Sequence, residues 1–286
     1  MKVNNMMDKR KLSRILIDSI THIILIVIVF LSIVPLLYMI STSLKPTGNE
    51  FDVPLTFFGP RIAWDNYQKA FTAVPVFRFL LNTLFIVITT LLGETIVSSF
   101  VAYGFARFNF PGKKILFSIL LATMMIPFFV TMIPLFIIFS RLRWINTFLP
   151  LIVPAFGGSA LYIFLLRQFY MSLPRDLDDA ARIDGASYFR IWWNILLPLT
   201  GPVLATVAIL SIVAHWNDFT GPLIILNSSS KYTLSLGLRL FRDQYTTRFN
   251  LTMAYAVMIT APMITVFFIF QKYFVRGIVM SGLTGR

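Results

Sequence analysis

Six long apolar segments restrict what this chain can fold into. They lie at residues 17–43, 79–106, 115–140, 148–167, 199–226 and 251–271. Each is long enough to cross the hydrocarbon core of a bilayer, which takes about 20 helical residues. Because the segments are continuously apolar and do not alternate in polarity, they predict membrane-spanning helices and exclude a transmembrane β-barrel.

The composition agrees with an all-α integral membrane protein. Hydrophobic residues make up 57% of the 286 residues and charged residues only 13%, against roughly 25% charged in ordinary soluble domains. The 15 Pro and 14 Gly predict kinked spans, because neighbouring helices can satisfy the backbone groups that a kink leaves free. We expect a six-helix domain over residues 17–275, flanked by terminal tails at 1–16 and 276–286.

The distribution of Lys and Arg predicts the orientation of the six spans. An even number of spans places both termini on one side, and 15 of the 25 Lys and Arg residues then fall on that side. Cytoplasmic segments are enriched in these residues, so both termini and the polar loop at 172–198 are expected in the cytoplasm. The first apolar segment is too long for a signal peptide and lacks a cleavage site, so we expect it to remain as a span.

The sequence offers no motif for catalysis or for binding a metal or cofactor. It contains no Cys, which excludes disulfides, Cys-based zinc sites and catalytic thiols. Residues 111–114 lack the first Gly and the Ser or Thr of an ATP-binding Walker A loop, and neither His22 nor His215 belongs to a His-Glu-x-x-His zinc motif. The net charge of +13 is spread over the loops, which argues against nucleic-acid binding. We predict a protein that is not an enzyme.

A polar segment at residues 176–199 separates the fourth and fifth apolar segments. Its acidic start predicts a short helix, since the helix dipole favours negative charge there, with Pro174 in the first turn. Gly185 predicts a turn, and Ser187 a cap for a second helix. The second helix carries one apolar stripe, made of Phe189, Trp192, Trp193 and Leu196, and Pro198 is expected to begin the next span.

The first of these two helices has distinct faces on a helical wheel. Leu177, Ala180 and Ala181 form a face of small and apolar residues that another surface can approach closely, while Asp179 points nearly the opposite way. Asp178 and Arg182 have the spacing of an intrahelical ion pair, which contributes a few tenths of a kcal/mol. We interpret that pair as ordinary helix support.

The spacing of residues in this polar segment resembles the EAA motif of permease subunits of bacterial ATP-binding-cassette (ABC) importers. The matching run is Asp179-Ala180-Ala181, three residues, Gly185, nine residues, then Ile195-x-Leu197-Pro198, with Asp where the family usually has Glu. Further segments are similar to the carbohydrate-uptake branch of the family, of the maltose-transporter type, and follow in the same order: residues 35–46, 66–67, 102–107, 216–219, 232–239 and 271–277.

The resemblance implies a division of labour in a bacterial inner membrane. A second permease subunit would complete the translocation path, two cytoplasmic ATPase subunits would dock below, and an extracytoplasmic solute-binding protein would deliver a carbohydrate. Coupling to the ATPase is then expected through Asp179, Ala180, Ala181, Asp184, Gly185, Ile195, Leu197 and Pro198. A non-sugar solute remains an alternative. A secondary transporter is disfavoured, because the sequence shows no internal repeat.

Polar residues within the apolar segments are candidates for the substrate path. They are Glu94 in the second segment and Trp216, Asn217 and Asp218 in the fifth. A buried carboxylate needs a cavity or a paired group, and sugar hydroxyls pair well with carboxylates and amides. For Glu94, hydrogen bonding between helices is the alternative.

The loop at residues 45–78 is longer than a helix–helix connection requires. Its aromatic content argues against disorder, and we predict a short amphipathic helix near Trp64 to Phe71. Such a loop either seals the outer ends of the first two helices or helps to dock the solute-binding protein.

Overall fold

The computed structural model describes residues 2–51, 56–57, 59–244 and 248–282. These residues form helices, turns and loops, with no strand among them. The predicted all-α membrane fold is therefore confirmed.

The chain divides into two compact units. The first comprises Met1–Ala73 and Phe241–Met258, and the second Val74–Leu240 and Ile259–Arg286. The first unit contains α1 (Lys2–Ser43), α2 (Asp65–Ala73) and the start of α14 (Phe249–Gly282). Helix α1 begins at Lys2, so helical backbone runs through the segment expected to be a terminal tail.

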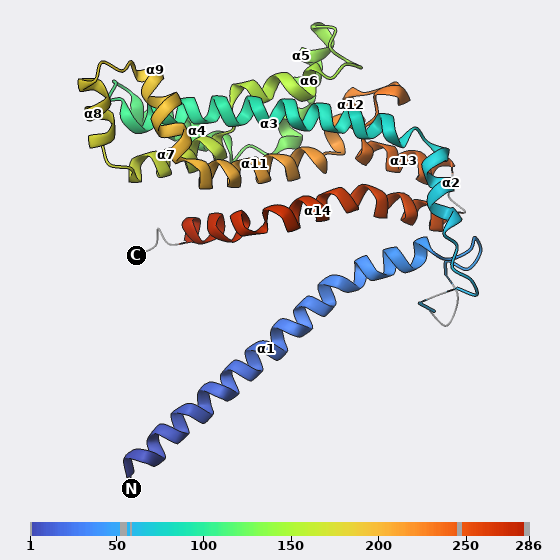
Figure 1. The fold of residues 1–286 in the computed structure, drawn as a ribbon. Helices are drawn as coiled ribbons and strands as arrows, with labels where there is room; N and C mark the ends of the chain where they lie inside the picture. Colours follow the sequence, from blue (N-terminus) through green and yellow to red (C-terminus); the bar gives the residue numbers. More distant parts are fainter. Residues whose placement is uncertain (1, 52–55, 58, 245–247, 283–286) are drawn as a thin grey trace. The chain divides into compact units, whose positions relative to one another are not determined.

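The second unit is organised around α3, which lies alongside α7 and α11 (Figure 1). Its elements are α3 (Val76–Arg107), α4 (Lys113–Thr123), α5 (Phe128–Arg141), α6 (Leu149–Ile152), η1 (Val153–Gly157), α7 (Ala160–Ser172), α8 (Asp176–Ile183), α9 (Tyr188–Ile191), η2 (Trp192–Leu196), α10 (Leu197–Leu199), α11 (Gly201–Trp216), α12 (Thr220–Ile225), η3 (Ser229–Lys231) and most of α13 (Leu234–Gln244). Element η2 is a π-helix, and η1 and η3 are 3₁₀-helices.

The described residues contain four helical stretches that are long and apolar enough to span a membrane: Ile15–Ser43, Val76–Arg107, Leu149–Ser172 and Phe249–Gln271. Two bent helix pairs, α4 with α5 and α9–α10 with α11, bring the number to six if each pair is one span. The six predicted segments therefore correspond to these six stretches, although the two bent pairs are not continuous helices and Leu149–Ser172 consists of α6, η1 and α7.

The third predicted segment, 115–140, corresponds to two helices with a sharp bend between them. Helices α4 and α5 meet at 96°, and the break lies before Pro127, the extended N-cap residue of α5. Proline has no backbone N–H to donate, and it disfavours helical geometry in the residue before it. The proline content predicted kinked spans, and Pro127 accounts for this bend.

The fifth predicted segment, 199–226, begins within two residues of α11 (Gly201), but it is wrong as one continuous helix to 226, because α11 ends at Trp216 and α12 follows. Pro198 lies within α10, and an 81° bend then separates Tyr188–Leu199 from Gly201–Trp216. Helix α11 ends at Trp216 because the next two side chains compete for backbone groups. Asn217 Nδ2 donates to the Val213 carbonyl at 2.8 Å, and Asp218 Oδ1 accepts from Gly221 N at 3.0 Å.

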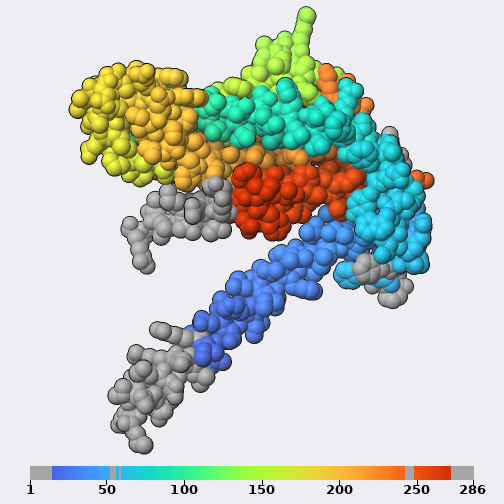
Figure 2. All heavy atoms as spheres, in the orientation of Figure 1, coloured from blue at the N-terminus to red at the C-terminus, as the bar shows by residue number. Residues whose placement is uncertain are grey.

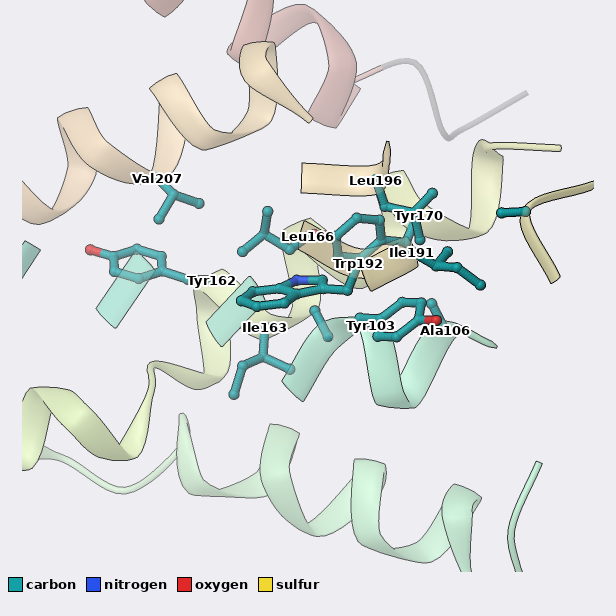
Figure 3. Close-up of a cluster of buried hydrophobic side chains, with 12 residues drawn as sticks. Tyr103, Ala106, Tyr162, Ile163, Leu166, Tyr170, Ile191, Trp192, Leu196 and Val207 are labelled. Atoms are coloured by element: carbon teal, nitrogen blue, oxygen red, sulfur yellow. The ribbon is translucent and has the colours of Figure 1, made fainter. Parts of the chain in front are cut away.

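A buried cluster in the second unit joins α3, α7 and the polar segment (Figure 3). Trp192 lies in the middle of this cluster, with its neighbours drawn from α3 and α7. Its Nε1 donates to Ser99 Oγ at 3.0 Å, and Ser99 Oγ is 2.7 Å from Tyr170 Oη. The indole therefore buries its large apolar surface while its one polar group stays paired.

In the first unit, buried polar side chains hold the connection that follows α1. Asn66 Nδ2 donates to the carbonyls of Ser43 and Lys45, both at 2.8 Å, and Asn250 Nδ2 donates to the Lys45 carbonyl at 3.1 Å. Ser43 Oγ also lies 2.7 Å from Tyr67 Oη. The predicted short helix in this loop is confirmed as α2, and its inner face is anchored to the end of α1.

We predict that Asn66→Ala lowers the free energy of unfolding by about 1–3 kcal/mol, because it removes a buried donor and leaves the Ser43 carbonyl without it. Unfolding of the detergent-solubilised protein measures this. Gln68→Ala, an exposed position on the same helix, is the matched control and should change stability by less than about 0.5 kcal/mol. Equal effects of the two substitutions would contradict the anchoring role.

Candidate functional site

The polar segment forms two short helices at one end of the second unit (yellow in Figure 2). Helix α8 begins at Asp176, one residue after its N-cap Arg175, so Pro174 precedes the helix and does not lie in its first turn as expected. Gly185 adopts φ +76°, and a Cβ there would meet nothing within 4 Å. The glycine is therefore required by backbone conformation and not by space. Ser187 Oγ accepts from Arg190 N at 3.3 Å, which confirms the predicted cap.

The inner face of α8 is tied to α3 by an ion pair. Arg107 Nε lies 3.0 Å from Asp178 Oδ2, and the two side chains are only 7% and 15% exposed. Arg107 also donates from Nη1 and Nη2 to the Leu173 carbonyl, both at 3.2 Å. Burial raises the pKa of the Asp178 carboxyl, and the Arg107 guanidinium acts against that rise.

The expected pair between Asp178 and Arg182 is wrong. Asp178 faces inward, where Arg107 is its partner, whereas Arg182 lies over the ring of Tyr188, with Cζ 5.2 Å from the ring centroid. Leaving a buried carboxylate without a charged partner costs several kcal/mol, whereas an exposed intrahelical pair contributes less than about 1 kcal/mol. Tertiary structure therefore overrides the local spacing.

The outer face of α8 consists of four exposed residues at helical spacing: Asp176, Asp179, Ala180 and Ile183. Ile183 is 87% exposed. Ala181, expected to share a face with Ala180, instead lies in the buried cluster, so that expectation is wrong. Asp184, the C-cap residue, is exposed. Sequence reasoning missed Ile183, although its spacing of four and three residues from Asp179 and Ala180 could have identified it.

The second half of the motif packs against the buried cluster. Ile195 and Leu197 are half-buried against it, and Pro198 is exposed beside the bend into α11. The predicted aromatic stripe divides, since Trp192 and Leu196 are buried while Phe189 and Trp193 are about half exposed. A π-helical turn at Trp192–Leu196 accounts for this division, because it changes the rotation between successive side chains.

A pocket of about 580 Å³ opens between the end of α3 and the two short helices. Its lining includes Arg107, Arg175 and Arg182 together with Asp178 and Asp179. This charged pocket is directly next to the outer face of α8, so the surface around α8 offers both an apolar side chain and charges of both signs.

The four candidate substrate-path residues do not form one cluster. Glu94 joins α3 to α11, with Oε2 accepting from Ser211 Oγ at 2.7 Å and Oε1 3.2 Å from His215 Nε2. Trp216 is buried and donates from Nε1 to the Ile259 carbonyl at 3.2 Å. Asn217 bonds to its own helix. The contacts of Glu94 with Ser211 and His215 are those expected for hydrogen bonding between helices.

Asp218 instead lines a pocket of about 420 Å³ formed by α5, α6, η1, α11 and α12. His215, which was not among the predicted site residues, lines the same pocket. The described residues include no group of three His, Asp or Glu side chains that could hold a metal ion.

Residues 94–280 match the model of a family described as binding-protein-dependent transport system inner membrane component. The chain belongs to this family. It is therefore a membrane permease, and its fold agrees with this assignment.

Several relatives are similar to the permease over nearly its whole length. The arabinooligosaccharides transport system permease protein AraQ of Halalkalibacterium halodurans is 35% identical over 97% of this chain and 100% of the relative. The diacetylchitobiose uptake system permease protein NgcG of Streptomyces coelicolor is 30% identical over 92% and 88%. The sn-glycerol-3-phosphate transport system permease protein UgpE of Yersinia enterocolitica is 32% identical over 93% and 97%.

Among solved structures, a chain of a bacterial ABC transporter involved in the import of the acidic polysaccharide alginate has the same fold. The TM-score is 0.78 at 23% identity, covering 89% of this chain and 95% of that chain.

We predict that Asp178→Asn destabilises the permease by about 3 kcal/mol, because it leaves the Arg107 guanidinium buried without its counter-charge. Asp176→Asn removes an exposed carboxylate from the same helix and should have little effect. Thermal unfolding of the two purified variants compares them. If both unfold at the wild-type temperature, the ion pair does not hold α8 to α3.

Proposed function

We propose that this permease is the translocation subunit of an ATP-driven importer for saccharides. A second permease subunit would complete the path, two cytoplasmic ATPase subunits would hydrolyse ATP, and an extracytoplasmic binding protein would supply the sugar. Both termini and α8 would face the cytoplasm of a bacterial cell. The family match and two relatives named for oligosaccharide transport support this proposal.

The exposed outer face of α8 is the observation that carries the proposal. Ile183, almost fully exposed at the end of a short charged helix, is the kind of side chain that a partner protein buries. Behind it, Ala181 and Asp178 are fixed against α3. A helix that is exposed on one face and anchored on the other can receive a force from an ATPase subunit and pass it to the spans.

The motif residues would then divide between contact with the ATPase, anchoring of the segment and the backbone turns. Asp179, Ala180 and Asp184 would contact the ATPase, since they are exposed. Ala181, Ile195 and Leu197 would fix the segment to the buried cluster. Gly185 would set the turn between the helices, and Pro198 lies beside the bend into α11.

We expect Ile183→Ser and Asp179→Asn each to weaken retention of the ATPase subunits on the purified permease, by about 1–2 kcal/mol for Ile183 from lost apolar burial. Co-purification and ATP-driven uptake into proteoliposomes measure the effect. Ile119→Ser is the control, because Ile119 is exposed on α4 and lies outside the motif. Unchanged retention in both α8 variants would exclude α8 as the coupling element.

We further propose that the loop containing α2 docks the binding protein. Its inner side is anchored by Asn66, while Trp64 and Phe71 are 68% and 51% exposed. A loop that only sealed the helix ends would bury such side chains. Arg61 and Lys69 supply positive charge nearby, and Lys69 Nζ bonds to Asp65 Oδ2 at 2.6 Å, which lowers the pKa of Asp65.

Arg61→Glu should reduce the stimulation of ATP hydrolysis by loaded binding protein, while basal hydrolysis stays unchanged. Lys69→Glu should do the same. Exchanging the charges, with Asp65→Lys and Lys69→Asp together, preserves an intrahelical pair and serves as the control for helix stability. Wild-type stimulation in both single variants over a range of salt concentrations would leave only the sealing role.

Asp218 is our proposed point of contact with the substrate. It lines the pocket of about 420 Å³, whereas Glu94 would act from behind through His215. The contacts of Trp216 and Asn217 with backbone carbonyls speak against direct roles for them.

A further inference from the structure

The pocket lined by His215 and Asp218 has an acidic wall. Asp218 Oδ1 accepts from Gly221 N at 3.0 Å, which orients the carboxylate. A Cβ at position 221 would lie 2.5 Å from Asp218 Oδ2. The carboxylate therefore occupies space that only a glycine at position 221 leaves open, and its position is closely determined.

A second carboxylate lies behind His215. Glu94 Oε1 is 3.2 Å from His215 Nε2, and Ser211 donates to the other oxygen, Oε2, at 2.7 Å. The Glu94 side chain is only 13% exposed. These contacts orient the imidazole toward α3. They place a second carboxylate directly behind a residue of the pocket wall.

The charges at this site do not cancel. Asp218 lines the pocket, and Glu94 lies behind His215. With both carboxylates ionised, they outnumber the single imidazole, so the local charge stays negative even when the imidazole is protonated. Of the described residues that line the pocket, none is Lys or Arg. An anionic ligand would therefore meet like charge with no cation to neutralise it, in a wall of low polarity where such repulsion is strong.

The rest of the wall suits a ligand with both hydroxyl groups and apolar faces. Phe128, Phe136 and Phe139 from α5 line it, together with Pro150 and Ile225. Carboxylate oxygens accept hydrogen bonds from hydroxyls, and a volume of about 420 Å³ is in the usual range for small-molecule sites.

We infer that this pocket selects uncharged saccharides and rejects anionic ones, such as phosphorylated polyols and uronic-acid oligosaccharides. The inference rests on the proposed function, since it takes the pocket to lie on the substrate path. The inference separates the permease from the relative named for sn-glycerol-3-phosphate transport and from the solved structure of a transporter involved in alginate import. It groups the permease with the relatives named for arabinooligosaccharides and diacetylchitobiose.

Ligand binding to the complete transporter in nanodiscs, without the binding protein, tests this inference. Saturation-transfer NMR would compare two probes of equal length, neutral arabinotriose and anionic trigalacturonate. We expect the wild-type complex to bind trigalacturonate at least about tenfold more weakly than arabinotriose. Asp218→Asn keeps the side-chain shape and the acceptor for Gly221 N, and it should bring the two affinities to within about threefold.

Asp18→Asn, which removes an exposed carboxylate from α1, is the control and should keep the wild-type preference. Equal binding of the two probes by the wild type, no binding of arabinotriose, or an unchanged preference in Asp218→Asn would each overturn the inference. The wild-type comparison alone can do so if the variant fails to fold. Retention of the ATPase subunits, measured on the same preparations, tests the proposed function separately.

Discussion

The ion pair between Arg107 and Asp178 connects the membrane-spanning part of the second unit to the segment outside it. Arg107 is the last residue of α3 and also donates to the Leu173 carbonyl just after α7. Three elements therefore meet at one guanidinium. Because the pair is nearly buried, breaking it would leave an unpaired charge, which ties α8 to the ends of α3 and α7.

Helix α3 also supplies polar partners to its neighbours at several points along its length. Asn82 near its start donates to the Ser230 and Tyr232 carbonyls. Thr83 accepts from Leu234 N, and Glu94 meets α11. Each contact satisfies a polar group that would otherwise lack a hydrogen-bond partner, because an apolar environment contains no water. Helix α3 thus holds its neighbours by a series of specific hydrogen bonds, in addition to nonspecific apolar packing.

Helix α11 links the α8–α10 segment to the pocket lined by His215 and Asp218. It starts after the 81° bend that follows the α8–α10 segment, and its last turn carries His215 at the pocket. A displacement of α8 that changed this bend would shift the end of α11 and the acidic wall that it carries. In the proposed function, coupling and selectivity would then both involve this one helix.

Local chemistry made several features predictable from the sequence alone. The spans follow from continuous apolar runs, the turn at Gly185 from the positive φ that glycine allows, and the cap at Ser187 from a side chain that bonds its own backbone. An ordered element at α2 was predictable because the loop is too rich in aromatic residues for disorder. None of these depends on what lies elsewhere in the chain.

Only the tertiary structure decided which polar groups pair. Asp178 has a candidate partner four residues away in Arg182, yet it pairs with Arg107 because the side of α8 that carries it faces α3. His215 lines the pocket, and its partner is Glu94, which is far away in sequence. Local spacing cannot determine such pairs, since the energy of a buried charge depends on whichever distant residue packing brings within reach.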